Sequence, residues 1–268
     1  MIASARMYSW SPPAAEAWHR LLGWVSKTAG VDLKLLDQSD PTPLDELWKR
    51  DDMGCVFMCG YPWALRSDRP ALLASPVPSP PRYGARAVYV TDFIVRADGP
   101  HRTLADTFGG SIAYSTEHSH SAYNAPRFHL LQHLTPSRRA LFGTVLGPYV
   151  RQRPVIDAVI KGEADVAAVD GYALDLMRRH DPAAAAQVRV VDTTVPAPSP
   201  PLVASPALSA AARERLIETL VNAHHAADAR TLLADVLLLR FDRVSPADFE
   251  VFLERERAAR DAGYAKLA

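Results

Sequence analysis

The chain has 268 residues, of which 48% are hydrophobic and 22% charged, the composition of an ordinary soluble globular protein with one large or two smaller domains. Its 30 basic and 30 acidic side chains balance, so no net field attracts nucleic acid or an anionic membrane surface. No hydrophobic run approaches the roughly 18 residues of a membrane span, which excludes a membrane-embedded protein.

The N-terminus and the cysteines bear on the compartment. Residues 1–10 lack the basic start and continuous hydrophobic core of a secretory signal. The sequence as written therefore indicates a cytoplasmic location, or a periplasmic one if a signal was removed or lies upstream. Cys55 and Cys59 are the only cysteines. In an extended strand their Cα atoms lie about 13 Å apart, beyond the roughly 7 Å that a disulfide allows, so we expect reduced thiols.

Strands and helices alternate in the first part of the chain. Ser11 and Pro12 mark a helix start, and Thr42 is a candidate cap for a second helix. We expect strands at 2–7, 31–36, 54–58 and 71–77, with helices at 12–29, at 42–49 and just after Gly60. A proline-rich link at 76–81 precedes one long predicted strand at 87–95.

The alternation continues in the second part. We expect strands at 111–115, 143–146, 164–169 and 188–194. A short helix should begin at 103, another helix should end at 134, and further helices are expected at 155–161 and 172–179. A second proline-rich link at 196–201 precedes a strand at 202–204 and helices at 207–224, 228–239 and 246–262. Such alternation predicts an α/β fold with two mainly parallel sheets flanked by helices.

The two long strands beside the proline-rich links suggest two crossings between lobes. We expect lobe 1 to comprise 1–92 and 193–268, and lobe 2 to be an insertion comprising 93–192. The two strands would then form a hinge. Because ligands of open α/β sheets bind at the carboxyl ends of strands, the ligand is expected in the cleft between the lobes.

Residues 110–126 hold the densest group of hydrogen-bond donors in the sequence. They read as a short buried strand, a turn rich in hydroxyl and imidazole groups, and the start of a helix. The first N–H groups of a helix lack intrahelical acceptors and favour anions. This segment therefore predicts a site for a small oxyanion.

Three segments carry a resemblance to a known family. They are 59–63 (Cys-Gly-Tyr-Pro-Trp), 106–113 with the turn at 119–123, and 155–170, whose helix–Gly–strand–Asp pattern is the most specific. With the hinge spacing, the chain resembles the phosphate/phosphite/phosphonate class of ABC-transporter solute-binding proteins, which have the type II periplasmic-binding fold. The resemblance implies capture of a small polar, anionic ligand by hinge closure, without a cofactor or a bound metal.

The resemblance also implies site residues and partners. The implied ligand contacts are Tyr8, Tyr61, Thr116, His118, Ser119, Ser121, Ala122, Tyr123 and Asp170. Asp170 would face an ammonium or hydroxyl group of the ligand, and Tyr8 and Tyr61 would close over the ligand. The implied partners are a small molecule and an ABC permease, with no nucleic acid, and the protein would be a monomer. Two positions depart from the family pattern: Ala122 stands where glycine is usual, and Gly147-Pro148-Tyr149 replaces a Gly-Ser-His element.

Other functions stay open on the sequence. A cytoplasmic ligand sensor could use the same scaffold, as could an enzyme that pairs Cys59 with His118. His129 and His133 lie four residues apart on one helix face, a spacing that can bind zinc. Without a fixed carboxylate or cysteine partner, such histidines are mostly structural, and we expect no metal site.

Overall fold

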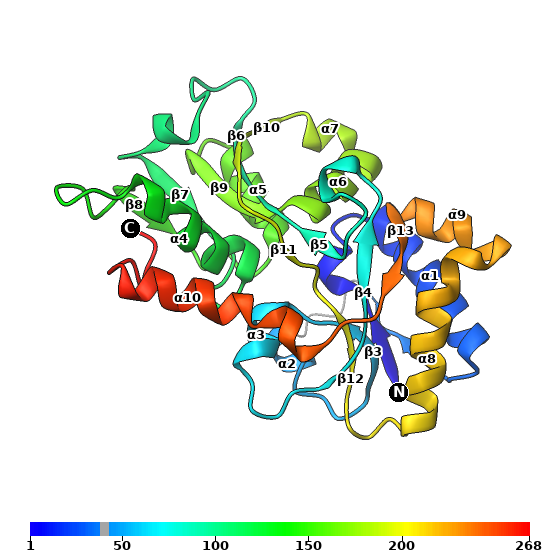
Figure 1. Ribbon diagram of the computed structural model, residues 1–268. Coiled ribbons are helices and arrows are strands. Elements are labelled where there is room, and N and C mark those ends of the chain that lie inside the picture. The colour runs from blue at the N-terminus through cyan, green and yellow to red at the C-terminus, as the bar shows by residue number, and fades with distance from the viewer. Residues whose placement is uncertain (38–42) are drawn as a thin grey trace. The chain divides into compact units, whose positions relative to one another are not determined.

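The computed structural model describes residues 1–37 and 43–268 and divides them into two compact units (Figure 1). Unit 1 comprises Met1–Val88, Asp175–His180 and Pro198–Phe249. Unit 2 comprises Tyr89–Leu174, Asp181–Ala197 and Glu250–Ala268. The predicted α/β class is confirmed, and each unit has its own sheet, but both sheets are mixed rather than mainly parallel because the returning strands pair antiparallel.

Unit 1 is built on a six-stranded sheet of order β13-β4-β12-β3-β1-β2. β1 pairs in parallel with β2 and β3, whereas β12 and β13 add antiparallel pairs. The strands are β1 (Ile2–Ser4), β2 (Lys34–Leu35), β3 (Met53–Phe57), β4 (Ala71–Pro78), β12 (Leu202–Ala204) and β13 (Leu238–Asp242). The α-helices are α1 (Pro12–Ala29), α2 (Leu44–Leu47), α3 (Gly60–Leu65), α8 (Ala210–Asn222) and α9 (Ala227–Asp235), with 3₁₀ turns η1 (Arg6–Tyr8), η2 (Pro81–Tyr83), η6 (Ala223–His225) and η7 (Pro246–Phe249).

Helix α1 has the bounds that the sequence predicts. The Ser11 side chain accepts a hydrogen bond from the Ala14 N–H, and Gly30 ends the helix in a left-handed conformation. The buried face of α1 carries Trp18, whose ring packs edge-on against Phe57 of β3 at a centroid distance of 5.0 Å. The helix is therefore held on the sheet of unit 1 by aromatic packing.

Unit 2 is built on a five-stranded sheet of order β10-β6-β9-β7-β8. β7 pairs in parallel with β8 and β9, and β6 is antiparallel to β9 and β10. The strands are β6 (Thr91–Arg96), β7 (Ser111–Ala113), β8 (Thr144–Leu146), β9 (Val166–Asp170) and β10 (Val188–Thr193). The helices are η3 (Leu104–Thr107), the π-turn η4 (His120–Asn124), α4 (Ala125–Leu130), η5 (Leu131–His133), α5 (Gln152–Ile160), α7 (Pro182–Ala185) and α10 (Val251–Asp261). The first residues of α6 (Gly171–His180) also belong to unit 2.

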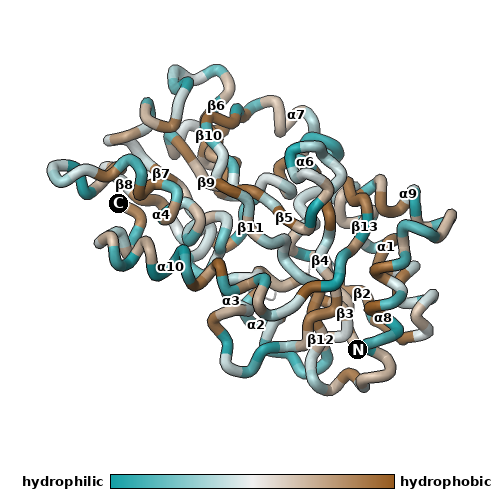
Figure 2. The backbone as a smooth tube through the Cα atoms, viewed as in Figure 1, coloured by the Kyte–Doolittle hydropathy of each residue, from teal (hydrophilic) through white to brown (hydrophobic). Residues whose placement is uncertain are grey.

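The central strands are hydrophobic because both faces are covered. Every residue of β3 and of β9 is buried, and Figure 2 shows hydrophobic residues gathered along these strands. In unit 2 the core also contains Phe93, Ile112 and Tyr123.

The predicted long strand at 87–95 is wrong, because the chain changes partner at Val90. β5 (Val88–Tyr89) pairs with β11 (Ala197–Pro198) in a separate two-stranded sheet, whereas β6 joins the sheet of unit 2. Between them, the Val90 carbonyl accepts a hydrogen bond from the Gly171 N–H. A hydrophobic run alone does not show where one strand's pairing ends.

The helix predicted at 228–239 is also too long. Leu237 has a positive φ of 54°, which ends the helical course, and Leu238 begins β13, antiparallel to β4. The predicted strand at 2–7 likewise ends at Ser4 and continues as η1. The helix predicted at 42–49 is α2, whereas its predicted cap Thr42 lies outside the described residues.

The C-terminal helix groups differently from the predicted boundaries. Residues 193–268 were expected with the first lobe, but Glu250–Ala268 belongs to unit 2 by its contacts. The Asn124 amide donates to the Phe252 carbonyl at 3.0 Å, and the Arg255 guanidinium donates to the Pro196 carbonyl at 2.6 Å. These bonds attach α10 to η4 and to the end of the β10 segment.

Two glycines should respond oppositely to alanine. A Cβ at Gly54 would lie 2.5 Å from Leu33 Cδ2 and 2.8 Å from Met1 Cβ, so Gly54→Ala should lower the free energy of unfolding by about 1–3 kcal/mol. Gly23 lies inside α1, where a Cβ would make an ordinary 3.7 Å contact with Leu35, so Gly23→Ala should raise it by about 0.5–1 kcal/mol. Urea unfolding of both variants measures the difference. Equal effects of the two substitutions would contradict this account of β3 packing.

Candidate functional site

The carboxyl ends of three strands meet at one edge of the unit 2 sheet. Because β7 is parallel to both β8 and β9, the segments that follow these strands lie at the same edge. They are the turn after Ala113, the loop that begins at Gly147, and Asp170 at the end of β9. The structure therefore brings together the hydroxyl-rich turn and the predicted Asp170.

The turn after β7 leads into a helix capped by Ser119. The Ser119 hydroxyl accepts a hydrogen bond from the Ala122 N–H at 3.1 Å and lies 3.4 Å from the Ser121 hydroxyl. The Asn124 N–H donates to the Ser119 carbonyl at 3.1 Å, so the first turn is a π-turn. The Ala122 N–H that the sequence assigned to the ligand is thus held by the cap in this structure.

Gln152 connects the two halves of the site and was not predicted. Its side-chain amide donates to the Ser121 hydroxyl at 3.1 Å, and its amide oxygen accepts a hydrogen bond from the Asp170 N–H at 2.9 Å. Gln152 is the first residue of α5, three positions before the family-like segment at 155–170. A polar side chain at a helix start was the only signal available in the sequence.

Asp170 has a local role as well as a place in the site. It is buried, and its Oδ1 accepts a hydrogen bond from the Ala173 N–H at 3.0 Å, which caps α6. The predicted capping role and the predicted ligand role are therefore compatible, because a carboxylate has several acceptor positions.

The other predicted residues of unit 2 differ in exposure. Thr116 is half-buried and its carbonyl accepts from the Ser119 N–H, while His118 is exposed on the turn. Tyr123 is buried in the unit 2 core, with its ring 5.0 Å from that of Tyr114. The ligand roles of these three residues stay predictions.

The loop that replaces the family's Gly-Ser-His element runs beside the turn. The Tyr149 N–H donates to the Tyr114 carbonyl at 3.2 Å, and the Val150 N–H donates to the Ser115 carbonyl at 2.9 Å. A Cβ at Gly147 would lie 2.6 Å from the Tyr114 carbonyl oxygen, so glycine is required there by close backbone approach. The departure from the family pattern therefore lies at the candidate site.

Two predicted tyrosines belong to unit 1. Tyr8 follows β1 in η1 and Tyr61 follows β3 in α3, so both come after neighbouring parallel strands. The Tyr8 ring is buried and packs edge-on against Phe57 at a centroid distance of 5.0 Å. Tyr61 is also buried. Their ligand roles stay predictions.

The cysteines are buried free thiols, as expected. Burial raises the pKa of Cys55 to about 12, so this thiol stays protonated at neutral pH and is a poor nucleophile. Cys59 is the N-cap residue of α3, and its side chain does not cap the helix.

His120 is a buried residue of the turn whose role was not predicted. Its Nδ1 lies 3.1 Å from the Asn124 amide nitrogen, and its Nε2 lies 3.4 Å from the Arg255 guanidinium. Burial, together with the positive charges of Arg255 and Arg127, lowers the pKa of His120 well below 6.5. A neutral His120 therefore links η4 to α10.

Comparison with known protein families shows which family the chain belongs to. Residues 9–249 match the family described as "ABC transporter, phosphonate, periplasmic substrate-binding protein". The chain belongs to this family. Its members are binding components of transporters, so the family favours ligand binding over the enzyme alternative that pairs Cys59 with His118. No curated protein is similar to the chain in sequence at a significant level.

Solved structures show the same fold at low sequence identity. A binding protein component of an ABC phosphonate transporter from Pseudomonas aeruginosa is 17% identical, with a TM-score of 0.79 over 98% of this chain and 87% of that one. PhnD1 from Prochlorococcus marinus, in complex with methylphosphonate, is 12% identical, with a TM-score of 0.76 over 97% of each chain. MatC from Rhodopseudomonas palustris, with bound malate, is 13% identical, with a TM-score of 0.58 over 98% of each chain. Within the described residues, no helix has both the length and the hydrophobicity of a membrane span.

The neutral state of His120 predicts an acid-dependent loss of stability. Above pH 6.5 both folded and unfolded states carry a neutral imidazole; below it the unfolded chain binds a proton that the folded protein excludes. This group alone should lower the free energy of unfolding by up to about 1.4 kcal/mol per pH unit below 6.5.

His120→Gln removes that titration. The variant should lose less stability than the parent between pH 7 and about pH 5, whatever its stability at neutral pH. Urea unfolding at several pH values provides the measurement. A variant with the same pH dependence as the parent would show that His120 is protonated in the folded state.

Proposed function

We propose that this chain captures a small phosphonate- or phosphate-like oxyanion at the carboxyl edge of the unit 2 sheet and delivers it to an ABC permease. The observation that carries the proposal is the network of Ser119, Ser121, Gln152 and Asp170, which joins the helix start after β7 to the end of β9. Family membership supports the same class of ligand.

The network suits an oxyanion with a polar second end. Serine hydroxyls and the first N–H groups of a helix donate hydrogen bonds, and the positive end of the helix dipole favours negative charge. Gln152 donates a hydrogen bond to the Ser121 hydroxyl, and when the Ser119 hydroxyl is the donor of the Ser119–Ser121 pair, the Ser121 proton is available for an acceptor on the ligand. The Asp170 carboxylate would repel a second anionic group and favour an ammonium or hydroxyl group instead.

The location follows from this role. A binding protein that serves uptake works outside the inner membrane, so we place the mature protein in the periplasm, which is where its family acts. Its direct partners would be the small ligand and the permease.

A ligand screen tests the chemical class. Thermal unfolding is followed with phosphate, methylphosphonate, an aminoalkylphosphonate, a sulfonate and malate, because a bound ligand raises stability as RT ln(1 + [L]/Kd). We expect the phosphonates to raise the unfolding temperature most, and the aminoalkylphosphonate to exceed methylphosphonate. Stabilisation by malate alone would instead indicate a carboxylate-binding protein.

Substitutions at the network test the site. Ser121→Ala should weaken phosphonate binding roughly tenfold or more, because hydrogen bonds to charged groups contribute about 1.5–3 kcal/mol. Asp170→Asn keeps an oxygen for the Ala173 N–H but removes the charge, so it should weaken the aminoalkylphosphonate more than methylphosphonate. Isothermal titration calorimetry measures both affinities.

The exposed Ser137 of the same unit provides the control, and Ser137→Ala should bind as the parent does. If Ser121→Ala and Asp170→Asn both keep the parent affinity for the ligand that the screen identifies, the ligand binds elsewhere.

A further inference from the structure

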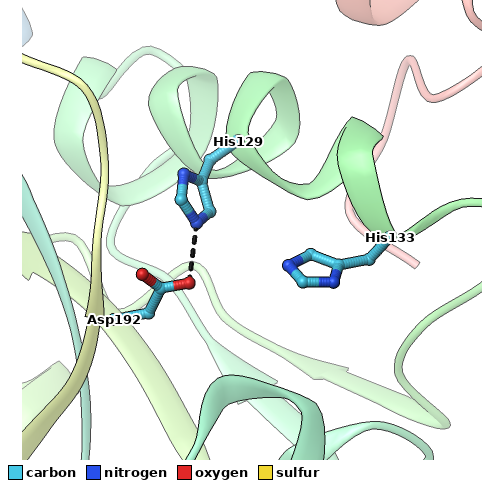
Figure 3. Close-up of side chains that lie close together, drawn as sticks. All are labelled: His129, His133 and Asp192. Atoms are coloured by element: carbon cyan, nitrogen blue, oxygen red, sulfur yellow. Dashed lines mark hydrogen bonds and ion pairs between the residues drawn. The ribbon is translucent and has the colours of Figure 1, made fainter.

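A second group of polar side chains in unit 2 lies apart from the serine network. It consists of His129 from α4, His133 from η5 and Asp192 from β10, and one ligand atom of each lies within 4.8 Å of the others. Figure 3 shows the three side chains converging on a common space. Two imidazoles and a carboxylate are a ligand set that zinc and related transition ions prefer.

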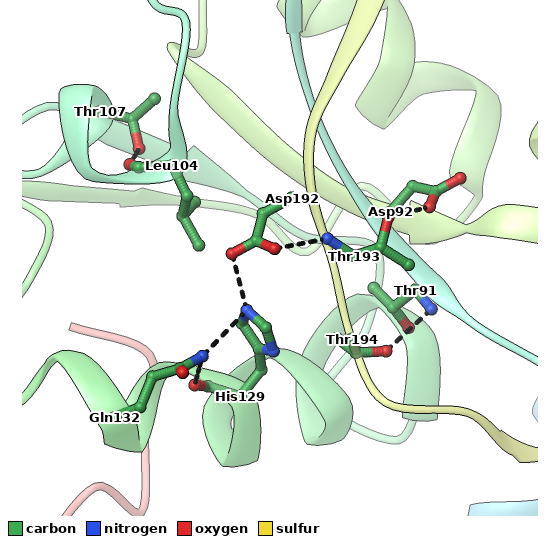
Figure 4. Close-up of polar contacts among 9 residues, drawn as sticks. All are labelled: Thr91, Asp92, Leu104, Thr107, His129, Gln132, Asp192, Thr193 and Thr194. Atoms are coloured by element: carbon green, nitrogen blue, oxygen red, sulfur yellow. Dashed lines mark hydrogen bonds and ion pairs between the residues drawn. The ribbon is translucent and has the colours of Figure 1, made fainter.

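Two of the three side chains are held in place before any ion arrives. His129 Nε2 lies 2.9 Å from Asp192 Oδ2, and the other Asp192 oxygen accepts a hydrogen bond from the Thr193 N–H at 2.7 Å (Figure 4). The Phe93 ring packs on the His129 ring at a centroid distance of 5.3 Å. These contacts fix the direction of both the imidazole and the carboxylate.

A structural role explains this pair, but it does not explain His133. The Nε2 atom of His133 is buried and has no hydrogen-bond partner among the residues that the structure describes. The ring stands edge-on to Phe108 at a centroid distance of 5.1 Å, so packing holds it while its nitrogen is left unsatisfied. Buried polar atoms normally have partners, and an orphaned imidazole nitrogen beside two potential ligands points to an ion.

We propose that His129, His133 and Asp192 bind one divalent transition ion of the zinc class, with water as the remaining ligand. Bond lengths of about 2.0–2.2 Å place the ligand atoms of a tetrahedral site about 3.3–3.6 Å apart. The present separations are 2.9 Å for the His129–Asp192 pair and no more than 4.8 Å for the other pairs, so small side-chain rotations complete the site.

The ion would tie the α4–η5 segment to the end of β10. It would add to the existing contact between His129 and Asp192. The amide of Gln132, whose nitrogen lies 3.3 Å from His129 Nε2, borders the same space and can turn its oxygen towards a bound water. The site uses none of the residues assigned to the oxyanion, so it stands or fails independently of the proposed function.

Zinc titration of the metal-free protein tests the site. Chelator-treated protein is titrated with zinc chloride by calorimetry and unfolded thermally with and without zinc. We expect one high-affinity zinc ion per chain and a raised unfolding temperature. Cobalt in place of zinc should give the strong visible absorption of a tetrahedral site.

Three variants identify the ligands. His133→Gln and Asp192→Asn should each weaken zinc binding by at least about tenfold and abolish the cobalt absorption. Asparagine at 192 keeps an acceptor for the Thr193 N–H, so the local fold is preserved. The control is His224→Gln in η6, where the rings of His224 and His225 lie 3.8 Å apart but form no group of three ligating residues with any other described residue; the zinc affinity of this variant should equal that of the parent.

Three outcomes would overturn the proposal. They are the absence of zinc binding by the parent, unchanged zinc affinity in His133→Gln, and a loss of affinity in His224→Gln instead. If Asp192→Asn lowers stability without metal but keeps the full zinc-induced rise in unfolding temperature, the cluster has a structural role alone. Should Asp192→Asn fail to fold, His133→Gln decides the question, because the Nε2 atom of His133 makes no hydrogen bond to any residue in the described part of the chain.

Discussion

The parallel pairing of β7 with both β8 and β9 is the constraint on which the candidate site depends. Parallel strands end at the same edge of a sheet, so three segments distant in the sequence must meet there. β9 is buried along its whole length, which fixes its register and therefore the position of Asp170. Because the strands follow this order, the hydroxyl-rich turn after β7 lies at the same edge of the sheet as the Asp170 carboxylate.

One side chain, that of Gln152, connects these neighbouring segments by hydrogen bonds. Gln152 reaches both the Ser121 hydroxyl and the Asp170 backbone, and it does so from the start of a third element. An amide serves this purpose well because it donates and accepts at once without a charge of its own. Gln152 thereby connects the helix start at Ser121, the end of β9 at Asp170 and the first turn of α5.

The same unit shows two ways in which histidines are used. His120 begins η4 and faces α10, where burial and then the nearby guanidinium groups lower its pKa and keep it neutral, and its contacts are structural. His133 lies beside another imidazole and a carboxylate, and its buried Nε2 has no hydrogen-bond partner among residues 1–37 and 43–268. Residue type alone does not distinguish these cases; the partners that packing supplies do. A prediction of no metal site from the sequence assumed that no carboxylate was near, and Asp192 is 59 positions beyond His133 along the chain.

Local physical chemistry in the sequence determined much of this protein. The Ser11 cap and Gly30 stop set α1, the hydrophobic runs located most of the strands, and the hydroxyl-rich turn before a helix was recognisable as such. What the sequence left undetermined depends on partners distant along the chain. The break at Val90, the strand at Leu238–Asp242 and the position of α10 follow from which strand or helix lies alongside. Gln152 and Asp192 belong to their clusters for the same reason. Capping and hydrophobic periodicity act over a few residues and can be read from the chain, whereas the meeting of Gln152 with Ser121 and of Asp192 with His129 is decided by sheet order and packing, which act across the whole of unit 2.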